Sequence, residues 1–396
     1  MAGVPRVTDY FEPRHPGLDP VVRETPSRAP PPGPISPAMR MRCDGGVMRC
    51  RWLWSFLAVL LIQPPAANAQ QVKLRATLQV AASEPYLGVP LVRFKEEVER
   101  RSDKALSVEI YDKGQLYIDT QVVDAIASGA IELGVAGTYQ FTKKIPDISI
   151  VEQPFLLNFE ALLRAAVDPD SEIRTMIDRA VLQATGVRVL WWQAAGSSVF
   201  FTKGPDAADP QAISGKRVRV FSQITAQMTK LCGGTPTVIS TSKMHNAMKD
   251  GTVDLAMGSI TSVEPRELWK VADTVTVTQH VPIEFMLLIN ERTWQSLSTR
   301  HRAILAEAAR EVEHATRERV AELESAAYTF ARTKGMRVRA LTADEVAEWR
   351  ACSADVLVGY MGLNSELARQ LIAAYGRLRS LACCSSAPSA GPFSRR

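Results

Sequence analysis

The chain has 396 residues, a length that suits two domains, and its 46% apolar and 22% charged content is ordinary for a globular protein. The net charge of +5 comes partly from the first 69 residues, and the chain has no basic stripe interleaved with aromatic residues, which argues against nucleic-acid binding. Five scattered histidines lack metal-ligand spacing with cysteines or carboxylates, so no metal site is predicted.

The first 69 residues divide into two segments. Residues 1–47 are rich in Pro, Arg and Gly without periodicity, which predicts a disordered extension, and Met48 is an alternative start codon. Residues 48–69 combine a short basic segment, the apolar run Trp52–Ile62 and small residues before Ala69, the pattern of a cleaved secretory signal peptide. The alternative is an uncleaved membrane anchor. Cleavage would leave a periplasmic protein without an integral membrane segment.

Two β-α-β-α-β patterns follow one another along the rest of the chain. The first has expected strands at Val72–Val80, Leu106–Tyr111 and Ile131–Val135, with helices near Leu91–Val98 and Asp119–Ala127. The second has expected strands at Val218–Phe221, Thr235–Ile239 and Val253–Met257, again with helices between them. Connections of this length suit parallel sheets. The patterns therefore predict two α/β lobes with a ligand cleft between them.

Segments between and after these patterns are candidates for a hinge. Strands are expected at Val187–Trp192, at Phe200–Lys203 as one crossing between lobes, and at Val281–Asn290 as a second. A long helix across both lobes is expected from Ser298 to about Lys334, the alternative being a helix broken in two. The expected boundaries are 70–196 with 284–323 for one lobe, 197–283 with 324–380 for the other, and 381–396 for a loose tail.

Arg219 is the first candidate binding residue. It lies on the expected strand Val218–Phe221, one residue from the end of an alternating Arg-Val-Arg-Val segment. Ligands of open α/β sheets bind beyond the carboxyl ends of strands, where a guanidinium can hold a carboxylate through two hydrogen bonds. A solvated surface arginine is the alternative interpretation.

Signals of catalysis are absent from the sequence. Neither a nucleophile elbow nor a phosphate-binding glycine loop is present, and no cofactor is predicted. Glu132 and Asp254 each follow a glycine at the start of a strand, so we expect structural roles for them rather than an acid pair. For the cysteines after residue 69, disulfides and free thiols both stay open. An exported, two-lobed chain without a catalytic set indicates binding.

A family resemblance supports this interpretation. The chain from about Val72 to Gly335 resembles the periplasmic substrate-binding subunits of TRAP (tripartite ATP-independent periplasmic) transporters, the DctP-like family. The resemblance rests on six motifs in family order: Lys113–Leu116, Gly129–Gly134, Gln153–Leu156, Gly215–Val220, Gly251–Asp254 and Leu288–Asn290. It implies a two-lobed periplasmic binding fold with a hinge, a central cleft and a long helix spanning both lobes. It also implies an organic-acid ligand that is delivered to ion-gradient-driven membrane subunits.

The resemblance also suggests binding residues. It assigns the ligand carboxylate to Arg219, while Ser197–Phe200 departs from the family by lacking an arginine that is often found there. The hypothesis is therefore one recognised carboxylate and a less polar remainder. The expected ligand-binding residues are Arg219, Phe221, Trp192, Phe200, Met257, Ser259, Tyr139, Gln140 and Glu84, with Thr138 as a further donor. Core packing is the alternative role of each aromatic residue.

Two other functions remain open on the sequence alone. One is an exported α/β enzyme that acts on a small carboxylate, which would need an acid, base or nucleophile near Arg219. The other is a ligand-sensing partner protein that uses the same fold without transport.

Overall fold

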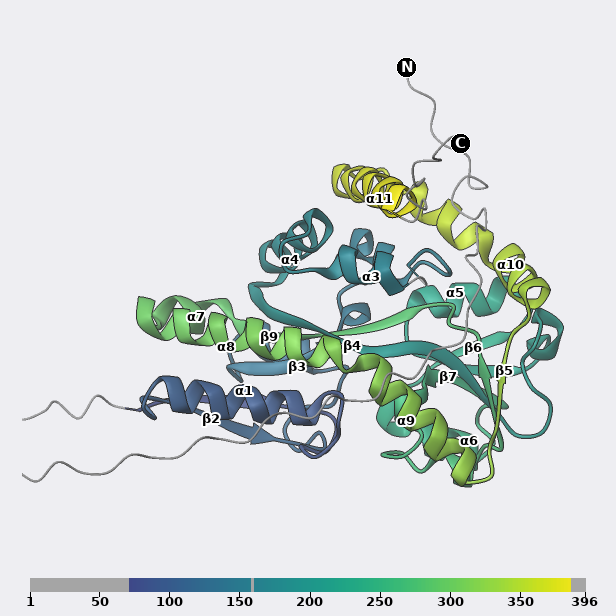
Figure 1. The fold of residues 1–396 in the computed structure, drawn as a ribbon, viewed down its shortest axis with the longest axis horizontal. Helices are drawn as coiled ribbons and strands as arrows, with labels where there is room; N and C mark the ends of the chain where they lie inside the picture. Colours follow the sequence, from purple (N-terminus) through teal and green to yellow (C-terminus); the bar gives the residue numbers. More distant parts are fainter. Residues whose placement is uncertain (1–70, 158–159, 386–396) are drawn as a thin grey trace, which may run out of the picture. The chain divides into compact units, whose positions relative to one another are not determined.

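The computed structural model describes residues 71–157 and 160–385 (Figure 1). The expected disordered extension (1–47), the expected signal peptide (48–69) and the last part of the expected tail (386–396) lie outside the described residues. Within the described ranges, no helix combines the length and the apolar character needed to cross a membrane.

The elements alternate between strands and helices along the chain. The strands are β1 (Val72–Thr77), β2 (Leu106–Tyr111), β3 (Leu133–Gly137), β4 (Val187–Thr202), β5 (Arg217–Val220), β6 (Thr235–Val238), β7 (Leu255–Ser259), β8 (Thr274–Val277), β9 (Pro282–Asn290) and β10 (Arg337–Ala340). The helices are α1 (Gly88–Arg101), α2 (Val122–Ser128), α3 (Glu160–Val167), α4 (Glu172–Thr185), α5 (Gln223–Leu231), α6 (Met244–Lys249), α7 (Glu291–Ser296), α8 (Thr299–Glu318), α9 (Val320–Thr333), α10 (Ala343–Met361) and α11 (Glu366–Ser385). Because α11 continues to Ser385, it extends into the segment expected to be a loose tail.

The strands form one connected sheet with two similar halves. Its order is β2-β1-β3-β9-β4-β7-β5-β6, and β8 joins β4 to β10. Strand β1 pairs in parallel with β2 and β3, and β5 pairs in parallel with β6 and β7. We call β1–β3 with α1 and α2 lobe I, and β5–β7 with α5 and α6 lobe II. The repeated β-α-β-α-β pattern and the two-lobed α/β fold predicted from the sequence are thus confirmed.

Strand β4 passes from one lobe to the other. It pairs antiparallel with β9 as far as Ser197 and with β7 from Ser198 onward, so the two segments expected as separate strands form one. The register shifts between Ala194 and Ser197, where Gly196 has a φ of +86°. A Cβ atom on Gly196 would lie 2.4 Å from Oε1 of Glu324 in α9 and displace this carboxylate, and the positive φ itself favours glycine.

The expected long helix is divided at Arg319 into α8 and α9. Helix α8 packs on α1 of lobe I and on β4, and α9 packs on β4, β10 and the 3-10 helix Ile260–Ser262 that follows β7 of lobe II, so the two segments together contact both lobes. Two ion pairs hold α8 in place: Arg174–Glu313 at 2.8 Å and Arg317–Glu284 at 3.1 Å. The broken helix is the alternative that the sequence left open.

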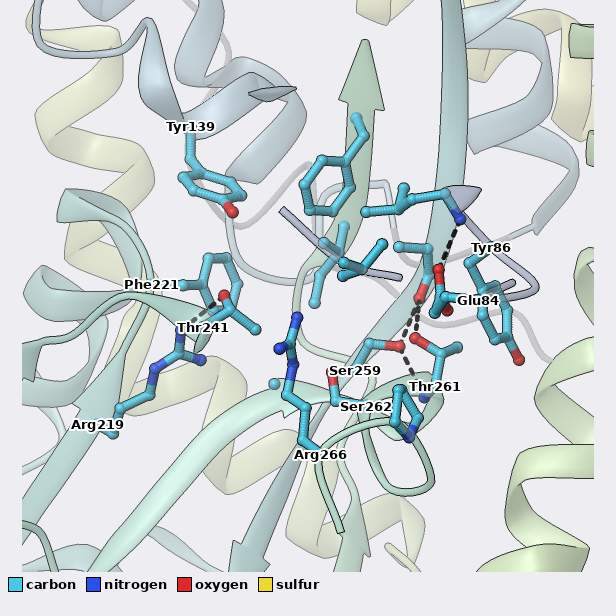
Figure 2. A pocket seen from close by; sticks show the side chains of 17 residues that line it. Glu84, Tyr86, Tyr139, Arg219, Phe221, Thr241, Ser259, Thr261, Ser262 and Arg266 are labelled. Atoms are coloured by element: carbon cyan, nitrogen blue, oxygen red, sulfur yellow. Dashed lines mark hydrogen bonds between the residues drawn. The ribbon is translucent and has the colours of Figure 1, made fainter. Parts of the chain in front are cut away.

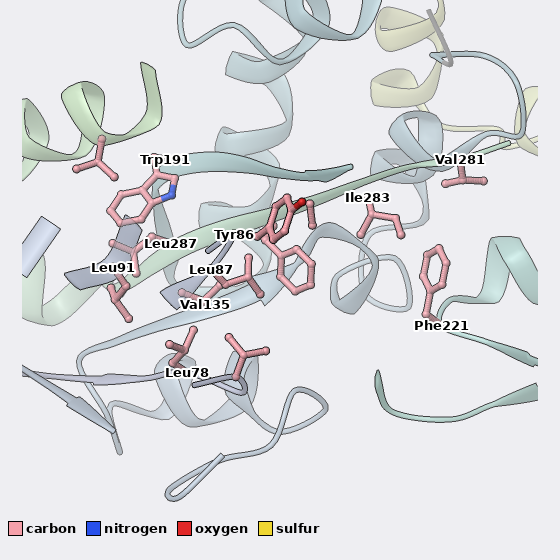
Figure 3. Close-up of a cluster of buried hydrophobic side chains, with 14 of the residues drawn as sticks. Leu78, Tyr86, Leu87, Leu91, Val135, Trp191, Phe221, Val281, Ile283 and Leu287 are labelled. Atoms are coloured by element: carbon pink, nitrogen blue, oxygen red, sulfur yellow. The ribbon is translucent and has the colours of Figure 1, made fainter. Parts of the chain in front are cut away.

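A continuous apolar core runs through both lobes. Figure 3 shows part of it, from Leu91 and Trp191 in the region of lobe I to Val281 and Phe221 near lobe II. The edge of the ring of Trp191 meets the ring of Phe94, with centroids 5.1 Å apart. The lobes therefore share apolar packing around the crossing strands.

A disulfide fixes α10 to lobe II. Cys232, just after α5, is bonded to Cys352 in α10, with a Cα–Cα distance of 5.1 Å and 120 residues between them in sequence. The side chains of Cys383 and Cys384 lie outside the described part of the chain. A disulfide is consistent with an oxidising compartment.

Replacing both Cys232 and Cys352 by serine should lower the free energy of unfolding by about 2–4 kcal/mol, because the bond closes a long loop in the unfolded chain. Urea unfolding of the oxidised proteins measures the difference. The matched control is the same comparison in a reducing buffer, where neither protein has the bond and the difference should vanish. Equal stability of the two oxidised proteins would contradict the prediction.

Candidate ligand-binding site

Arg219 is a buried arginine at the carboxyl end of β5. Alternation along the strand turns Val218 and Val220 into the apolar core and Arg219 to the opposite face, where the side chain is 1% exposed. Its Nε donates to the carbonyl of Ile239 at 2.8 Å, Nη1 to the carbonyl of Met257 at 2.6 Å, and Nη2 to Oγ1 of Thr241 at 2.9 Å. Burial lowers the pKa of Arg219 to about 10, which still leaves the group charged at neutral pH.

This arginine lines a cavity of about 50 Å³ between the lobes (Figure 2). Because a single water occupies roughly 10–15 Å³ on this measure, the cavity suits a small ligand. Lobe II contributes Arg219, Phe221, Thr241, Gly258, Ser259, Thr261, Ser262, Pro265 and Arg266; lobe I contributes Val80, Glu84, Tyr86, Leu87 and Tyr139; and the crossing strands contribute Ala195, Ile283 and Phe285.

Arg266 is a second guanidinium at the same cavity, and the sequence analysis missed it. Figure 2 shows its side chain rising between Arg219 and Ser262 into the cavity. Its buried Nε has no hydrogen-bond partner among the described residues. Desolvation lowers the pKa of Arg266, and the charge of Glu84 opposes this effect. Within the described chain, neither arginine forms an ion pair with a carboxylate, so two positive charges face one small cavity.

Glu84 supplies negative charge on the lobe I side. Its side chain is 7% exposed, and its Oε2 accepts from the backbone N–H of Leu87 at 2.8 Å, at the start of α1. Burial raises the pKa of Glu84 above its ordinary value, while backbone N–H groups and the charge of Arg266 lower it. The cavity therefore has a positive wall on lobe II and an acidic group on lobe I.

Aromatic rings form the apolar part of the cavity. The ring of Tyr139 lies 5.5 Å from that of Phe221 and 6.0 Å from that of Phe285, measured between centroids. Tyr139 comes from the short 3-10 helix after β3, and burial raises its pKa to about 12, so its hydroxyl stays protonated. These rings can contact the apolar part of a ligand whose anionic group lies at the arginines.

Five of the nine residues expected from the sequence line the cavity: Arg219, Phe221, Ser259, Tyr139 and Glu84. Oγ of Ser259 donates to the carbonyl of Ala195 and accepts from the N–H of Thr261 at 3.2 Å, so it joins lobe II to β4. Because its hydroxyl is already committed to these two contacts, Ser259 shapes the wall of the cavity.

The other four, Trp192, Phe200, Met257 and Gln140, do not line it. Trp192 packs in a separate apolar cluster, and its Nε1 donates to Asp178 at 2.8 Å. Phe200 is stacked between His280 and Trp349, with centroids 5.4 and 5.2 Å away. Met257 has a buried side chain whose sulfur contacts His280, and it serves Arg219 through its carbonyl. Gln140, like the buried Thr138, lies in the 3-10 helix of Tyr139 and not on the cavity wall.

Glu132 and Asp254 have the structural roles expected for them. Oε1 of Glu132 accepts from Nη2 of Arg75 at 2.8 Å, and Oδ1 of Asp254 accepts from Nη2 of Arg217 at 2.6 Å. Both pairs tie neighbouring strands together at the end remote from the cavity. Among the described residues, no group of three His, Cys, Asp or Glu side chains is arranged to hold a metal ion.

The fold and the cavity define a two-lobed solute-binding protein with a positively charged site. Comparison with known families agrees: residues 79–361 match the model of the bacterial extracellular solute-binding protein family 7, DctP. The chain therefore belongs to this family, the substrate-binding subunits of TRAP transporters that the sequence motifs predicted. Its members are binding receptors and not enzymes, which removes the enzyme alternative.

Known relatives cover most of the described chain. The C4-dicarboxylate-binding periplasmic protein DctP of Rhodobacter capsulatus is 24% identical over 288 residues, 72% of this chain and 84% of the relative. The solved DctP7 of Bordetella pertussis, an extracytoplasmic solute receptor binding pyroglutamic acid, superposes with a TM-score of 0.73 at 19% identity, over 77% of this chain and 99% of DctP7. A TRAP periplasmic solute-binding protein of Pseudomonas aeruginosa with bound L-malate superposes with a TM-score of 0.68 at 20% identity, over 73% of this chain and 100% of the solved chain. At these identities the two structures show the shared fold.

A buried carboxyl group lies outside the lining of the cavity. Glu152 ends a 3-10 helix of lobe I, is 1% exposed, and has no hydrogen-bond partner for either carboxylate oxygen among the described residues. Burial raises its pKa to about 8, with nearby Ser222 of lobe II opposing the shift. Glu152 is therefore a neutral carboxyl group at pH 7.

This raised pKa predicts a pH-dependent stability. The folded chain keeps a proton that the unfolded chain loses above its ordinary pKa of 4.5, so the stability provided by this proton is lost as pH rises toward 8. Relative to Glu152→Gln, the unmodified protein should lose up to about 1.4 kcal/mol of unfolding free energy per pH unit in that window. Urea unfolding at pH 5, 6, 7 and 8 measures this slope, with exposed Glu264→Gln as the control. Parallel pH profiles for the two variants would refute the assignment.

Proposed function

We propose that this protein captures a small organic acid in the cavity between its lobes and delivers it to TRAP membrane subunits for ion-gradient-driven uptake. The observation that carries this proposal is the pair of guanidinium groups, Arg219 and Arg266, at one small cavity without a carboxylate partner in the described chain. A buried, unpaired charge is costly, and an anionic ligand removes that cost on binding. A planar guanidinium also matches a carboxylate through parallel hydrogen bonds.

The structure extends the ligand hypothesis from one arginine to two. Arg219 keeps three of its donors on Ile239, Met257 and Thr241, so its position is fixed before a ligand arrives. The Nε of Arg266 has no hydrogen-bond partner among the described residues, so this donor remains for a ligand. We propose that Arg219 defines where the carboxylate lies and that Arg266 supplies most of the new hydrogen bonds.

The opposite wall narrows the class of acid. Glu84 accepts hydrogen bonds, and Tyr139, Phe221 and Phe285 offer aromatic surface. An acid that also carries a hydroxyl or N–H group fits this arrangement, because its donor can face Glu84. Pyroglutamic acid and L-malate, the acids bound by the two solved relatives, each have such a donor. The cavity volume of about 50 Å³ also favours acids of this size.

The N-terminal segment and the disulfide support a periplasmic place of action. We propose that residues 48–69 are removed as a signal peptide and that the remaining chain works in the periplasm, where Cys232–Cys352 persists. Uptake of the identified acid should require the protein together with its membrane subunits. If cells lacking the protein take up the acid normally but lose a transcriptional response to it, the sensor alternative holds instead.

A thermal-shift screen of pyroglutamate, L-malate, D-glucuronate, D-galacturonate and D-erythronate tests the binding proposal. A true ligand at 100 times its dissociation constant should stabilise the protein by about 2.7 kcal/mol. If none of the five acids, nor a wider set of small carboxylates, shifts the unmodified protein, the proposal is wrong.

Variants of the two arginines separate binding from folding. Arg266→Met should weaken binding of the best acid about 10- to 100-fold while leaving the ligand-free protein as stable or more stable, because it removes an unpaired charge. Arg219→Met should weaken binding and also destabilise the fold, since it leaves the carbonyls of Ile239 and Met257 without donors. Calorimetric titration and urea unfolding give both readouts. The matched control is Arg217→Met on the same strand, which should bind normally.

A further inference from the structure

A set of contacts joins the lobes beside the cavity without lining it. Asp119, in the segment before α2 of lobe I, is 5% exposed. Its Oδ1 accepts from Oγ of Ser240 at 2.6 Å, and its Oδ2 accepts from the N–H of Thr241 at 3.4 Å. Ser240 and Thr241 belong to the loop after β6 of lobe II. A carboxylate of one lobe therefore holds a loop of the other.

The same loop holds the guanidinium of Arg219. The carbonyl of Ile239 accepts from its Nε at 2.8 Å, and Oγ1 of Thr241 accepts from its Nη2 at 2.9 Å. The residues Ile239–Thr241 thus have Asp119 on one side and Arg219 on the other. No direct ion pair links Asp119 to Arg219 within the described chain, so any effect of this carboxylate on the geometry of Arg219 passes through the loop.

We infer that Asp119 is a positioning residue for Arg219, and that it orients the guanidinium only when lobe I has closed on lobe II. The loop Ile239–Thr241 transmits this effect. Opening the lobes would withdraw the Asp119 carboxylate, free the loop and leave Arg219 with its remaining bond to Met257 as its main anchor. The inference rests on the proposed function, in which Arg219 holds the acid group of the ligand.

The charge of Asp119 acts in the same direction as its geometry. Its negative charge favours the charged forms of Arg219 and Arg266, against the desolvation that lowers the pKa of both. Closure therefore brings a counter-charge near the positive wall without occupying the donors that an acid would use. The contact of Asp119 with the loop is made by protein groups alone, so it orders Arg219 before an acid binds.

The first test needs no ligand. In protein labelled with ¹⁵N-arginine, the Nε–H signal of Arg219 is assigned by its loss in Arg219→Lys, and its exchange with solvent is measured. Asp119→Ala should speed this exchange at least about tenfold, since loss of a charged hydrogen-bond partner loosens the loop. The Nε–H of Arg174, which donates to Asp178 at 2.6 Å in lobe I, is the internal control and should not change.

The matched control variant is Asp124→Ala, which removes an exposed carboxylate from nearby α2. If Arg219 exchanges equally fast in the Asp119→Ala and Asp124→Ala proteins, the inference is overturned. This result would leave the proposed function untouched, because acid binding is measured separately.

The second test uses the acid among pyroglutamate, L-malate and D-galacturonate that stabilises the unmodified protein most. Asp119→Ala and Thr241→Val should each weaken its binding about tenfold, and Thr241→Ser, which keeps the hydroxyl, should bind almost normally. The double variant Asp119→Ala, Thr241→Val should bind no more weakly than Thr241→Val alone, because both changes interrupt one path. Additive losses would show that Asp119 acts independently of Thr241 and would overturn the inference.

Discussion

The site depends on keeping a guanidinium charged inside the protein. Arg219 is almost fully buried, so its desolvation has to be offset by acceptors, and the chain provides the carbonyls of Ile239 and Met257 and the hydroxyl of Thr241. Ile239 and Thr241 follow β6, and Met257 lies within β7, the two strands that flank β5. Neutral acceptors satisfy the N–H groups without cancelling the charge. A carboxylate in their place would have stabilised the fold more simply, but it would have left little attraction for an anionic ligand.

The two crossing strands connect this site to lobe motion. Strand β4 changes its partner from β9 to β7 at Ser197 and Ser198, and Gly196 beside them has a left-handed conformation closed off by Glu324. The N–H of Ser197 donates to Oε1 of Glu324 at 3.0 Å, which fastens the crossing to α9. The break at Arg319 falls between the helix on lobe I and this contact. The left-handed glycine and the helix break thus lie where the chain would have to bend for the lobes to move relative to each other.

Sequence reasoning reached the parts of the site that follow from strand periodicity. Arg219 was predictable because alternation in a short strand sets the face of each side chain, and Tyr139 and Ser259 because they follow strand ends. Trp192 was assigned to the wrong face since β4 shifts register between Val189 and Trp191 and again after Ala194. Arg266 lies in an irregular segment beyond β7, where no helical or strand periodicity predicts the direction of a side chain. Its position in a loop after a strand end was nevertheless a signal for a binding residue.

The position of Asp119 explains how Arg219 can be held in place although no carboxylate of the described chain forms an ion pair with it. A carboxylate touching Arg219 directly would compete with the ligand, whereas one acting through Ser240 and Thr241 fixes the loop and leaves the charge unpaired. The distance imposed by the intervening loop weakens the Coulomb attraction but preserves its sign. In the proposed mechanism, closure strengthens the site for an acid instead of filling it. An open form would lack this support, so the arginine that attracts the acid would become a complete binding partner only as the lobes meet.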